Sequence, residues 1–390
     1  MRTDSDVIVV GLGGMGSAAA AHLARRGRRV IGLERFGSAH AYGSSHGDSR
    51  VYRQAYFEDP DYVPLLLRAF ELWQDLNATT GRDLLKVTGG LMIGPPDSRT
   101  VTGSRASAER WDLPHQMLDA AELHTRFPSF HPRPDEIALW ETNAGFARPE
   151  ATVAAHLDQA GRADADLRFG QAVTGWSAAD GGVTVTTADE TFRAQRLVLA
   201  AGAWASGVIT DLGVPLRVER QVQFWFRPPG GTRPFAADQF PIYVWDGDDG
   251  LQIYGFPHDG TDAGVKAAFF RRGTPAEPET LRRGVAPDEV IPLLDFLRPR
   301  IPALPGPVVR AVPCMYTNTP DEHFVIGLHP SHPNVAVAAG FSGHGFKFVP
   351  VIGEILADLI IDGRSRLDIS LFDPARLAAV PVPGPAPAHR

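Results

Sequence analysis

The sequence predicts an α/β protein in which a domain with a parallel sheet is combined with a second, strand-rich domain. Three observations lead to this prediction. A short apolar strand, a glycine-rich turn, an alanine-rich helix and a second strand follow one another within residues 6–34. A second apolar strand, RLVLAAGAW at 196–204, returns to the same domain in the middle of the chain. Alternating apolar and polar side chains predict antiparallel strands at 183–204, 221–228, 251–257 and 264–270.

Composition and charge limit the possible functions. The 390 residues are 44% hydrophobic and 21% charged, which is typical of a globular protein of about two to three domains. The formal net charge of −7 leaves no basic surface for a nucleic acid. We find no apolar run of about 18 residues that would span a membrane, and no signal peptide at the acidic N-terminus. We therefore expect a soluble, cytoplasmic protein.

The first element is the clearest. Residues 6–10 (DVIVV) form a short β-branched strand, and GLGGMG follows at 11–16. An alanine-rich helix then runs to Gly27, which suits a helix end. A second strand at 30–33 leads directly into Glu34. This order gives a β-α-β unit of the expected length.

The glycines of this unit predict a dinucleotide site. Gly11 allows a tight turn, Gly13 lets a pyrophosphate approach the backbone, and Gly16 allows the helix to pack closely on the strand. Glu34 stands where an acid binds a ribose hydroxyl, and it favours FAD or NAD over NADP. The alternative is a glycine-rich turn without a ligand, which the strand, helix and acid together disfavour.

Other segments fit the same organisation. Helical periodicity marks 63–76, 151–160 and 351–361. The C-terminal stretch PVPGPAPAHR, from Pro381, is rich in proline and alanine and is expected to be unstructured.

The segment GSSHG at 43–47 resembles the nucleophile elbow of hydrolases. That motif needs a buried strand before it and a helix after it, whereas RFGSAHAY precedes it here. Ser45, His46 and Asp48 are also too close in sequence to form a catalytic triad in the known chain orders. A hydrolase is therefore disfavoured.

Three cationic side chains occur among apolar neighbours. Arg50 and Arg53 lie in GDSRVYRQAY, where partial burial would require an anion as partner. Lys266 is the lone charge of the strand segment AGVKAAFF. A lysine on a strand is usually solvated, but one that faces a pocket is a functional candidate because burial of its charge is costly.

A second glycine-rich turn occurs near the C-terminus. The apolar strand VAVAAG leads into GFSGHGFKF at 340–348, and an amphipathic helix follows. This arrangement brings backbone N–H groups and a helix start towards an acceptor, with His344 and Lys347 beside them. A plain glycine-rich connection is the alternative.

The single cysteine, Cys314, excludes internal disulfides, zinc sites built from several cysteines and cysteine-ligated iron–sulfur clusters. No metal centre is expected. Cys314 itself could be an inert core residue, a nucleophile or a covalent anchor, and spacing alone does not choose among these.

Together these motifs resemble the monomeric sarcosine oxidase and N-methyltryptophan oxidase family of FAD-dependent amine oxidases, of the glycine/D-amino acid oxidase type. The resemblance spans nearly the whole chain, through DVIVVGLGGMG, GSSHGDSRVYRQAY, YVPLLLRAFELW, LAAGAW, YGFP, CMYTNTPDEHFVIGLHP and AAGFSGHGFKF. It implies a Rossmann-like FAD-binding domain and a substrate domain built on a mixed, mostly antiparallel sheet.

The resemblance also implies how the cofactor is held. Cys314 would attach the flavin through an 8α-thioether, and Lys266 would help O₂ react with the reduced flavin. Ser49 and Arg50 would lie against the isoalloxazine ring, with His46 close by. The full set of implied FAD contacts is Gly11, Gly13, Gly14, Met15, Gly16, Glu34, Arg35, Ser45, His46, Ser49, Arg50, Val173, Gly202, Trp204, Cys314, Met315, Phe341, Gly343, Gly345, Phe346 and Lys347.

For the substrate, the resemblance implies that Arg53 and Lys347 bind a carboxylate. Glu58 would sit in a mobile loop at the mouth of the substrate pocket. The implied catalytic residues are Lys266, Arg50, His344, Arg53 and Lys347, and the implied pocket residues are Arg53, Glu58, Tyr254, Phe270, Tyr316, His344 and Lys347. Phe270 is a departure, because sarcosine-specific members carry a histidine there.

The implied reaction is oxidation of a secondary amino acid, sarcosine or another N-methyl amino acid. A hydride equivalent would pass to flavin N5, O₂ would become H₂O₂, and the imine would hydrolyse to the demethylated amine and formaldehyde. Cyclic amino acids such as L-pipecolate or proline are an alternative substrate class. A NAD-dependent dehydrogenase and an FAD-binding protein without turnover remain as other classes of function.

The resemblance finally divides the chain into discontinuous domains. Residues 1–86, 147–218 and 315–375 would form the FAD domain, and residues 87–146 and 219–314 the substrate domain. Residues 376–390 would be a flexible tail. The protein is expected to be a monomer.

Overall fold

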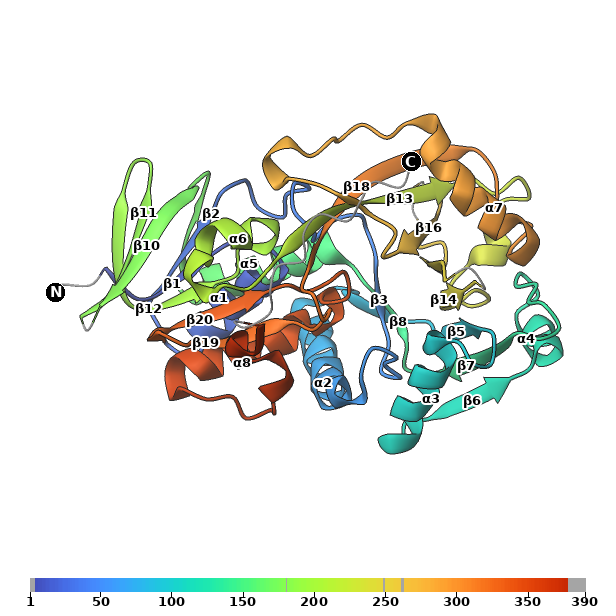
Figure 1. Cartoon of the computed structure of the whole chain (residues 1–390), viewed down its shortest axis with the longest axis horizontal. Coiled ribbons are helices and arrows are strands. Elements are labelled where there is room, and N and C mark those ends of the chain that lie inside the picture. The colour runs from blue at the N-terminus through green and yellow to red at the C-terminus, as the bar shows by residue number, and fades with distance from the viewer. Residues whose placement is uncertain (1–3, 180, 248–249, 261–262, 378–390) are drawn as a thin grey trace.

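The computed structural model describes residues 4–179, 181–247, 250–260 and 263–377. The molecule is elongated, with an eight-stranded sheet towards one end and a nine-stranded sheet towards the other (Figure 1). The described residues contain no helix that is long and apolar enough to cross a membrane.

The first sheet has a parallel centre. Its strands run in the order β10-β11-β12-β1-β2-β9, and β20 also pairs with β12 and with β19. The pairs of β1 with β2 and β12, of β2 with β9 and of β12 with β20 are parallel. The strands are β1 (Ser5–Val10), β2 (Val30–Glu34), β9 (Asp166–Phe169), β10 (Val173–Ala179), β11 (Gly182–Thr187), β12 (Thr191–Leu199), β19 (Val325–His329) and β20 (His332–Ala339).

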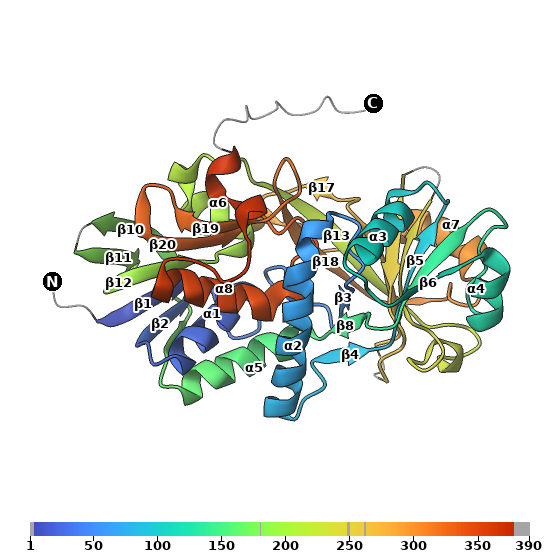
Figure 2. The same ribbon diagram turned by 90° about the horizontal axis from the view of Figure 1, so that it is seen from below.

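Helices cover one face of this sheet. Figure 2 shows α1 (Gly14–Arg25), α5 (Pro149–Arg162) and α8 (Val349–Asp362) together on one side, with α2 (Val63–Thr80) beside them. The alanines of α1 allow close packing: a Cβ at Gly353 of α8 would lie only 2.6 Å from the Cβ of Ala18. Close packing against α8 on one side and the first sheet on the other fixes the start of α1 near the ends of β1 and β12.

The second sheet is mixed and mostly antiparallel, as the sequence predicts. Its order is β17-β13-β16-β15-β14-β5-β7-β6, with β18 also paired to β13, and among the described residues β14 and β5 are the only pair that runs parallel. The strands are β5 (Gly90–Gly94), β6 (His115–Leu118), β7 (Ile137–Glu141), β13 (Arg217–Phe226), β14 (Ile242–Asp246), β15 (Gln252–Gly255), β16 (Val265–Phe270), β17 (Thr274–Pro275) and β18 (Val308–Asn318).

Aromatic side chains fill the core of the second sheet. Phe130 stacks on Phe240 with ring centroids 4.5 Å apart, and Tyr243 meets both rings edge-on. Burial of such rings supplies most of the stabilisation in a core of this size. The accompanying helices are α3 (Arg99–Arg110), α4 (Ala120–Arg126) and α7 (Ile291–Arg300).

A small third sheet lies between the two larger ones. Its strands are β3 (Arg50–Tyr52), β8 (Gly145–Ala147) and β4 (Leu85–Val87), in the order β3-β8-β4. It places the residues that follow Arg50 between the parallel sheet and the aromatic core.

The predicted elements are largely present, with two corrections. The segment 183–204 is not one kind of strand: β12 pairs antiparallel with β11 but parallel with β1 and β20, and a short helical turn, η2 (Gly202–Trp204), ends it. The tail was predicted to begin at residue 376, but Pro374–Leu377 forms the helical turn η9, and Leu377 is buried because it packs on the first sheet's core. Residues 378–390, which include the stretch from Pro381, lie outside the described residues. The other predicted domain limits remain predictions.

Candidate active site

The turn after β1 has the backbone that the sequence predicts. Gly11 has φ +84°, and a Cβ there would lie 2.5 Å from the carbonyl oxygen of Ala200. A Cβ at Gly16 would collide with the carbonyl of Gly11, which explains the close packing of α1 on β1. Gly13 differs, because the nearest atom to its Cβ would be Ser45 Oγ at 3.9 Å. The backbone of Gly13 therefore borders open space.

Glu34 occupies the end of β2 beside this turn. One carboxylate oxygen accepts the Leu12 N–H at 2.8 Å, and the other accepts the Phe36 N–H at 3.0 Å and lies 3.2 Å from His40 Nε2. Burial alone would raise the pKa of Glu34, but the hydrogen bonds from His40 and the two backbone N–H groups outweigh it and lower the pKa. Glu34 is thus held as a carboxylate.

These residues border a first cavity, whose volume out to its open mouth is about 1470 Å³. Its walls come from the turn after β1, the end of β2, the turn after β12, β18 and the loop before α8. The predicted cofactor residues that line it are Gly11, Gly13, Gly14, Met15, Glu34, Arg35, Ser45, Arg50, Val173, Gly202, Trp204, Cys314, Met315, Phe341, Gly343, Gly345 and Phe346.

Four predicted cofactor residues do not line this cavity. Gly16 faces the backbone of Gly11, and Lys347 lines a neighbouring cavity. His46 is buried, and burial first, then the charge of Arg50, lowers its pKa to about 3. Its Nε2 has no hydrogen-bond partner in the described part of the chain. Ser49 acts through its carbonyl, which accepts hydrogen bonds from Lys266 and Arg50.

Sequence reasoning missed several residues of this cavity. His40, Ser44 and Thr317 line it. Ser44 lies within GSSHG and Thr317 within the segment that begins with CMYT, but neither was singled out as a cofactor contact, and His40 lies in no motif. His40 is near the acid at the end of β2, so proximity in sequence was the only signal available. The glycine cradle, the buried carboxylate of Glu34 and the size of the cavity fit a dinucleotide such as FAD.

Cys314 projects from β18 into the first cavity. It is 1% exposed, and its Sγ lies 3.5 Å from a guanidinium nitrogen of Arg50 and 3.7 Å from the Ser44 carbonyl. The same Arg50 donates to the carbonyls of Ser44 and Ser49, each at 2.8 Å. Arg50 thereby connects the thiol to the loop that begins with GSSHG.

A second cavity of about 500 Å³ adjoins the first. Arg50, Tyr316, Gly343 and Phe346 line both, so the two spaces share a wall. All seven predicted pocket residues line the second cavity: Arg53, Glu58, Tyr254, Phe270, Tyr316, His344 and Lys347.

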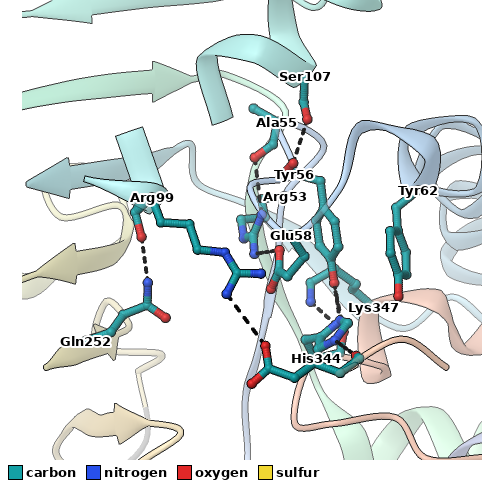
Figure 3. Close-up of polar contacts among 12 residues, drawn as sticks. Arg53, Ala55, Tyr56, Glu58, Tyr62, Arg99, Ser107, Gln252, His344 and Lys347 are labelled. Carbon is teal, nitrogen blue, oxygen red and sulfur yellow. Dashed lines mark hydrogen bonds and ion pairs between the residues drawn. The ribbon is translucent and has the colours of Figure 1, made fainter. Parts of the chain in front are cut away.

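Arg53 and Glu58 form a buried ion pair in this cavity (Figure 3). A guanidinium nitrogen lies 2.5 Å from a carboxylate oxygen, and each side chain is 3% exposed. The rings of Tyr56 and Phe57 flank the guanidinium at 4.3 and 4.0 Å. Burial would raise the pKa of Glu58, but the charge of Arg53 dominates and lowers it to about 2.

The predicted position of Glu58 in a mobile loop at the pocket mouth stays a prediction. Its carboxylate lies inside the cavity because the buried guanidinium of Arg53 requires a counter-charge. The ion pair occupies the place where a carboxylate ligand of Arg53 would bind.

Lys347 and His344 lie opposite this pair. The Lys347 ammonium donates to the His344 carbonyl at 2.7 Å, and burial, assisted by the charge of Arg53, lowers the pKa of Lys347 to about 7. His344 Nδ1 lies 2.5 Å from the hydroxyl of Tyr56 (Figure 3). Its Nε2 lies 3.0 Å from the Glu322 carbonyl. A carbonyl can only accept, so Nε2 carries the proton and Nδ1 accepts from Tyr56. Burial lowers the pKa of His344 well below its usual value, which keeps the ring neutral.

Lys266 is buried and does not line either cavity. Its ammonium donates to the carbonyls of Gly47 at 2.6 Å and Ser49 at 2.8 Å, and it lies 4.9 Å from the Phe256 ring centroid. The usual solvated position of a strand lysine is therefore excluded. Burial, reinforced by the charge of Arg50, lowers the pKa of Lys266 well below its ordinary value.

A cluster with possible metal ligands lies elsewhere, at the turn between β19 and β20. Donor atoms of Asp211, His329 and His332 lie within 4.8 Å of one another. However, His329 Nδ1 accepts the Ser331 N–H at 3.2 Å, so its proton resides on Nε2, which lies 3.2 Å from Asp211. This is the arrangement of a histidine–carboxylate pair.

Comparison with known proteins agrees with this site. Residues 6–359 match the family described as "DAO: FAD dependent oxidoreductase". Monomeric sarcosine oxidase of Streptomyces avermitilis is 56% identical over 98% of this chain and 100% of that protein. N-methyl-L-tryptophan oxidase of Salmonella dublin is 34% identical over 96% of this chain and 99% of that protein.

Among solved structures, the open form of NikD, an unusual amino acid oxidase essential for nikkomycin biosynthesis, has a TM-score of 0.81 and 27% identity. The match covers 96% of this chain and 98% of that one. The cradle after β1, the carboxylate of Glu34 and these full-length likenesses lead to one conclusion: the chain belongs to the FAD-dependent oxidoreductase family.

Proposed function

We propose that the protein is an FAD-dependent oxidase of N-methyl or other secondary amino acids. The single observation that supports this most is the second cavity, which adjoins the FAD cavity and presents Arg53 and Lys347 to a small ligand. The names of the Streptomyces and Salmonella relatives point to N-methyl amino acids as the substrate class. Bound FAD would supply the acceptor for a hydride equivalent and return its electrons to O₂, which gives H₂O₂.

The cations would hold and orient the substrate. A substrate carboxylate would replace Glu58 as the partner of Arg53 and would accept a second hydrogen bond from Lys347. A bound carboxylate fixes the position of the neighbouring amine, and such orientation supplies much of the acceleration in these reactions. Tyr254, Tyr316 and Phe270 would form the apolar wall around the remainder of the molecule.

Lys266 would serve the O₂ half-reaction. The Gly47 and Ser49 carbonyls hold its ammonium at a fixed place behind the loop that carries Arg50. In its protonated form the side chain would place a positive charge there, which would stabilise the negative charge that develops when O₂ accepts an electron. We expect Lys266→Met to slow reoxidation far more than reduction by substrate, as stopped-flow kinetics would resolve; equal slowing of both would contradict this role.

Cys314 would attach the flavin covalently through an 8α-thioether. Its burial in the wall of the first cavity and its contact with Arg50 support this assignment, because they hold the thiol at a fixed place beside the space that a flavin would occupy. Acid precipitation tests it: the yellow colour should stay in the washed pellet and should move to the supernatant with Cys314→Ala. Colour in the supernatant of the parent protein would make Cys314 a core residue.

Cyclic amino acids are a second candidate substrate class. Phe270 stands where sarcosine-specific members carry a histidine, and its ring lies 6.1 Å from that of Tyr316. This aromatic corner favours a ring or a larger apolar group over the single methyl group of sarcosine.

Anaerobic bleaching of the flavin tests the substrate class. Sarcosine, N-methyl-L-tryptophan, L-proline and L-pipecolate would each be mixed with the protein in the absence of O₂, and the initial rate of bleaching compared. The proposal expects bleaching by at least one N-methyl amino acid. Bleaching by the cyclic compounds alone would favour the second class, and a yellow protein that no amine bleaches would contradict both.

The name of the Streptomyces relative also describes a monomer, and we propose the same state for this chain. A molar mass near 42.1 kDa in solution is then expected from light scattering.

A further inference from the structure

A segment of the second domain reaches back to the first cavity. Residues 276–284 follow β17 and include the helical turn η5 (Pro278–Thr280). Both ends of this segment are tied to β13: the Ala276 N–H donates to the Val218 carbonyl at 3.0 Å. At the other end, Arg220 donates to the carbonyls of Arg282 at 2.8 Å and Gly284 at 2.9 Å. Hydrogen bonds to β13 therefore fix both ends of the segment, and its middle residues extend from these fixed ends.

Glu279 joins two separate parts of the cavity wall. One carboxylate oxygen lies 2.8 Å from a guanidinium nitrogen of Arg35, and the other accepts the indole N–H of Trp204 at 3.0 Å. Arg35 follows β2, Trp204 follows β12, and both line the first cavity. The Arg35 guanidinium also lies 5.4 Å from the Trp204 ring centroid, so the three side chains form one unit.

Leu281 and Arg283 reach two further parts of the wall. Leu281 is 8% exposed and packs with Ala203 and Met315, which both line the cavity. Arg283 donates to the carbonyls of Ala41 at 3.1 Å and Tyr42 at 3.0 Å. Ala41 and Tyr42 lie between His40 and Gly43, which both line the cavity.

We infer that residues 276–284 form a clasp that retains FAD in the first cavity. The clasp holds together Arg35, the 41–42 backbone, residues 203–204 and Met315, while none of its own described residues lines the cavity. These wall segments are remote in sequence, so the clasp limits how far they separate. It therefore controls the rate at which FAD enters and the rate at which FAD leaves while no covalent bond to Cys314 holds it. The inference requires bound FAD but no particular amine substrate, so it stands apart from the proposed function.

The polar contacts of the clasp are weak enough to break and form again. The side chains of Arg35 and Glu279 are 40% and 57% exposed, so their ion pair is weak and screened by salt. Leu281 contributes the apolar part of the closure. Release of FAD should accordingly become faster as ionic strength rises.

The rate of FAD release tests the inference. Cys314→Ala would be the common background, so that FAD is held by non-covalent contacts only. Glu279→Gln would be compared with Glu277→Gln, which removes the same charge two residues earlier from an exposed side chain that makes no hydrogen bond or ion pair with the described residues. Protein would be separated from free flavin at timed intervals, and the visible absorbance of the retained FAD measured.

We expect Glu279→Gln to release FAD roughly threefold to tenfold faster than the background, the effect of one weak ion pair and one hydrogen bond. Glu277→Gln should match the background. The Glu279 variant should also lose most of the dependence of the release rate on ionic strength. If Glu279→Gln does not fold, Arg283→Gln replaces it in the test. This variant removes the contact with the 41–42 backbone and should also release FAD faster than the background.

Equal release rates for the two glutamate variants would overturn the inference. The inference would also be overturned if Glu279→Gln released FAD faster but its FAD-free form unfolded at a clearly lower temperature than the FAD-free background. That result would indicate general destabilisation of the protein. The bleaching assay above tests the amine oxidase separately, since it concerns the second cavity.

Discussion

Arg53 and Glu58 place two opposite charges where almost no water reaches them. Such a pair is sensitive to the loss of either member, because the remaining charge is left without a partner. The low pKa of Glu58 means that its carboxylate depends on the guanidinium. The stability of this part of the cavity therefore rests on the pair as a unit.

We predict that Arg53→Met destabilises the protein by roughly 3 kcal/mol or more, the usual cost of removing one member of a buried ion pair. The double variant Arg53→Met with Glu58→Gln should recover most of this loss, since no charge is then left unpaired. Unfolding in urea measures both changes. A double variant that is no more stable than the single one would show that the charge of Glu58 is not the cause.

The lowered pKa of Lys347 predicts that ligand binding depends on pH. Its pKa is lowered to about 7, so the ammonium loses its proton as the pH rises through neutrality. A carboxylate that lacks an amine, such as propionate, should therefore bind more weakly above about pH 7, as measured by the change it causes in the visible flavin spectrum. Lys347→Gln should weaken binding at low pH and remove the dependence in this range. An unchanged pH profile in the variant would assign the effect to another group.

Single residues also show where sequence reasoning stops. The carboxylate of Glu34 and the glycines after β1 were predictable, because a local motif specifies them. The contact of Tyr56 with His344 joins residues 288 positions apart, and no local pattern encodes it. The position of Glu58 likewise depends on a buried partner that sequence does not reveal as buried.

At the scale of elements, the turn between β1 and α1 separates two kinds of glycine. Gly16 serves packing, because its Cβ would collide with the Gly11 carbonyl. Gly13 serves the ligand, because its Cβ would enter space close only to Ser45. The same motif therefore supports stability and binding at different positions.

We predict that Gly13→Ala changes the free energy of unfolding of the FAD-free protein by less than about 1 kcal/mol but weakens FAD binding, since the methyl group occupies space beside the backbone N–H groups. Gly16→Ala should instead destabilise the FAD-free protein, because a backbone contact has to give way. Urea unfolding and flavin titration separate the two effects. Similar losses of stability in both variants would contradict this division.

The elements that were predicted from sequence are those with a strong local period. The β1–α1–β2 unit, α2, α5 and α8 have such a period, and β20 and the turn after it were found from VAVAAG and the glycines that follow. The second sheet was seen only in part, because short strands such as β5 and β7 are paired by distant contacts. Two helices were missed: α3 is strongly polar overall and buries mainly small side chains, whereas α7 has only a weak apolar stripe and contains Pro299.

At the scale of the whole molecule, two histidines link stability to pH. His156 of α5 is buried and His22 of α1 is partly buried, and the loss of hydration is the main cause that lowers the pKa of each to about 3. The unfolded chain binds these protons near pH 6.5, whereas the folded protein does not. Stability should therefore fall as the pH decreases from about 6.5 towards 3, by up to about 1.4 kcal/mol per pH unit for each group.

His156→Leu should reduce this loss, because one of the two groups no longer takes up a proton on unfolding. The midpoint of urea unfolding, measured at several pH values, gives the slope. His131→Leu, which changes an exposed histidine, should retain the slope of the parent. A slope that is the same in all three proteins would place the acid sensitivity elsewhere.

The parallel pairing of β12 with β20 has a consequence for biosynthesis. It joins residues 197–199 to residues 335–337, and the glycine loop that completes the first cavity follows only after β20. A growing chain on the ribosome lacks this strand and this loop until residues 332–346 have been translated. Until then the nascent protein has no complete place for the flavin, so uptake of FAD has to follow the synthesis of this loop rather than accompany the folding of β1, α1 and β2.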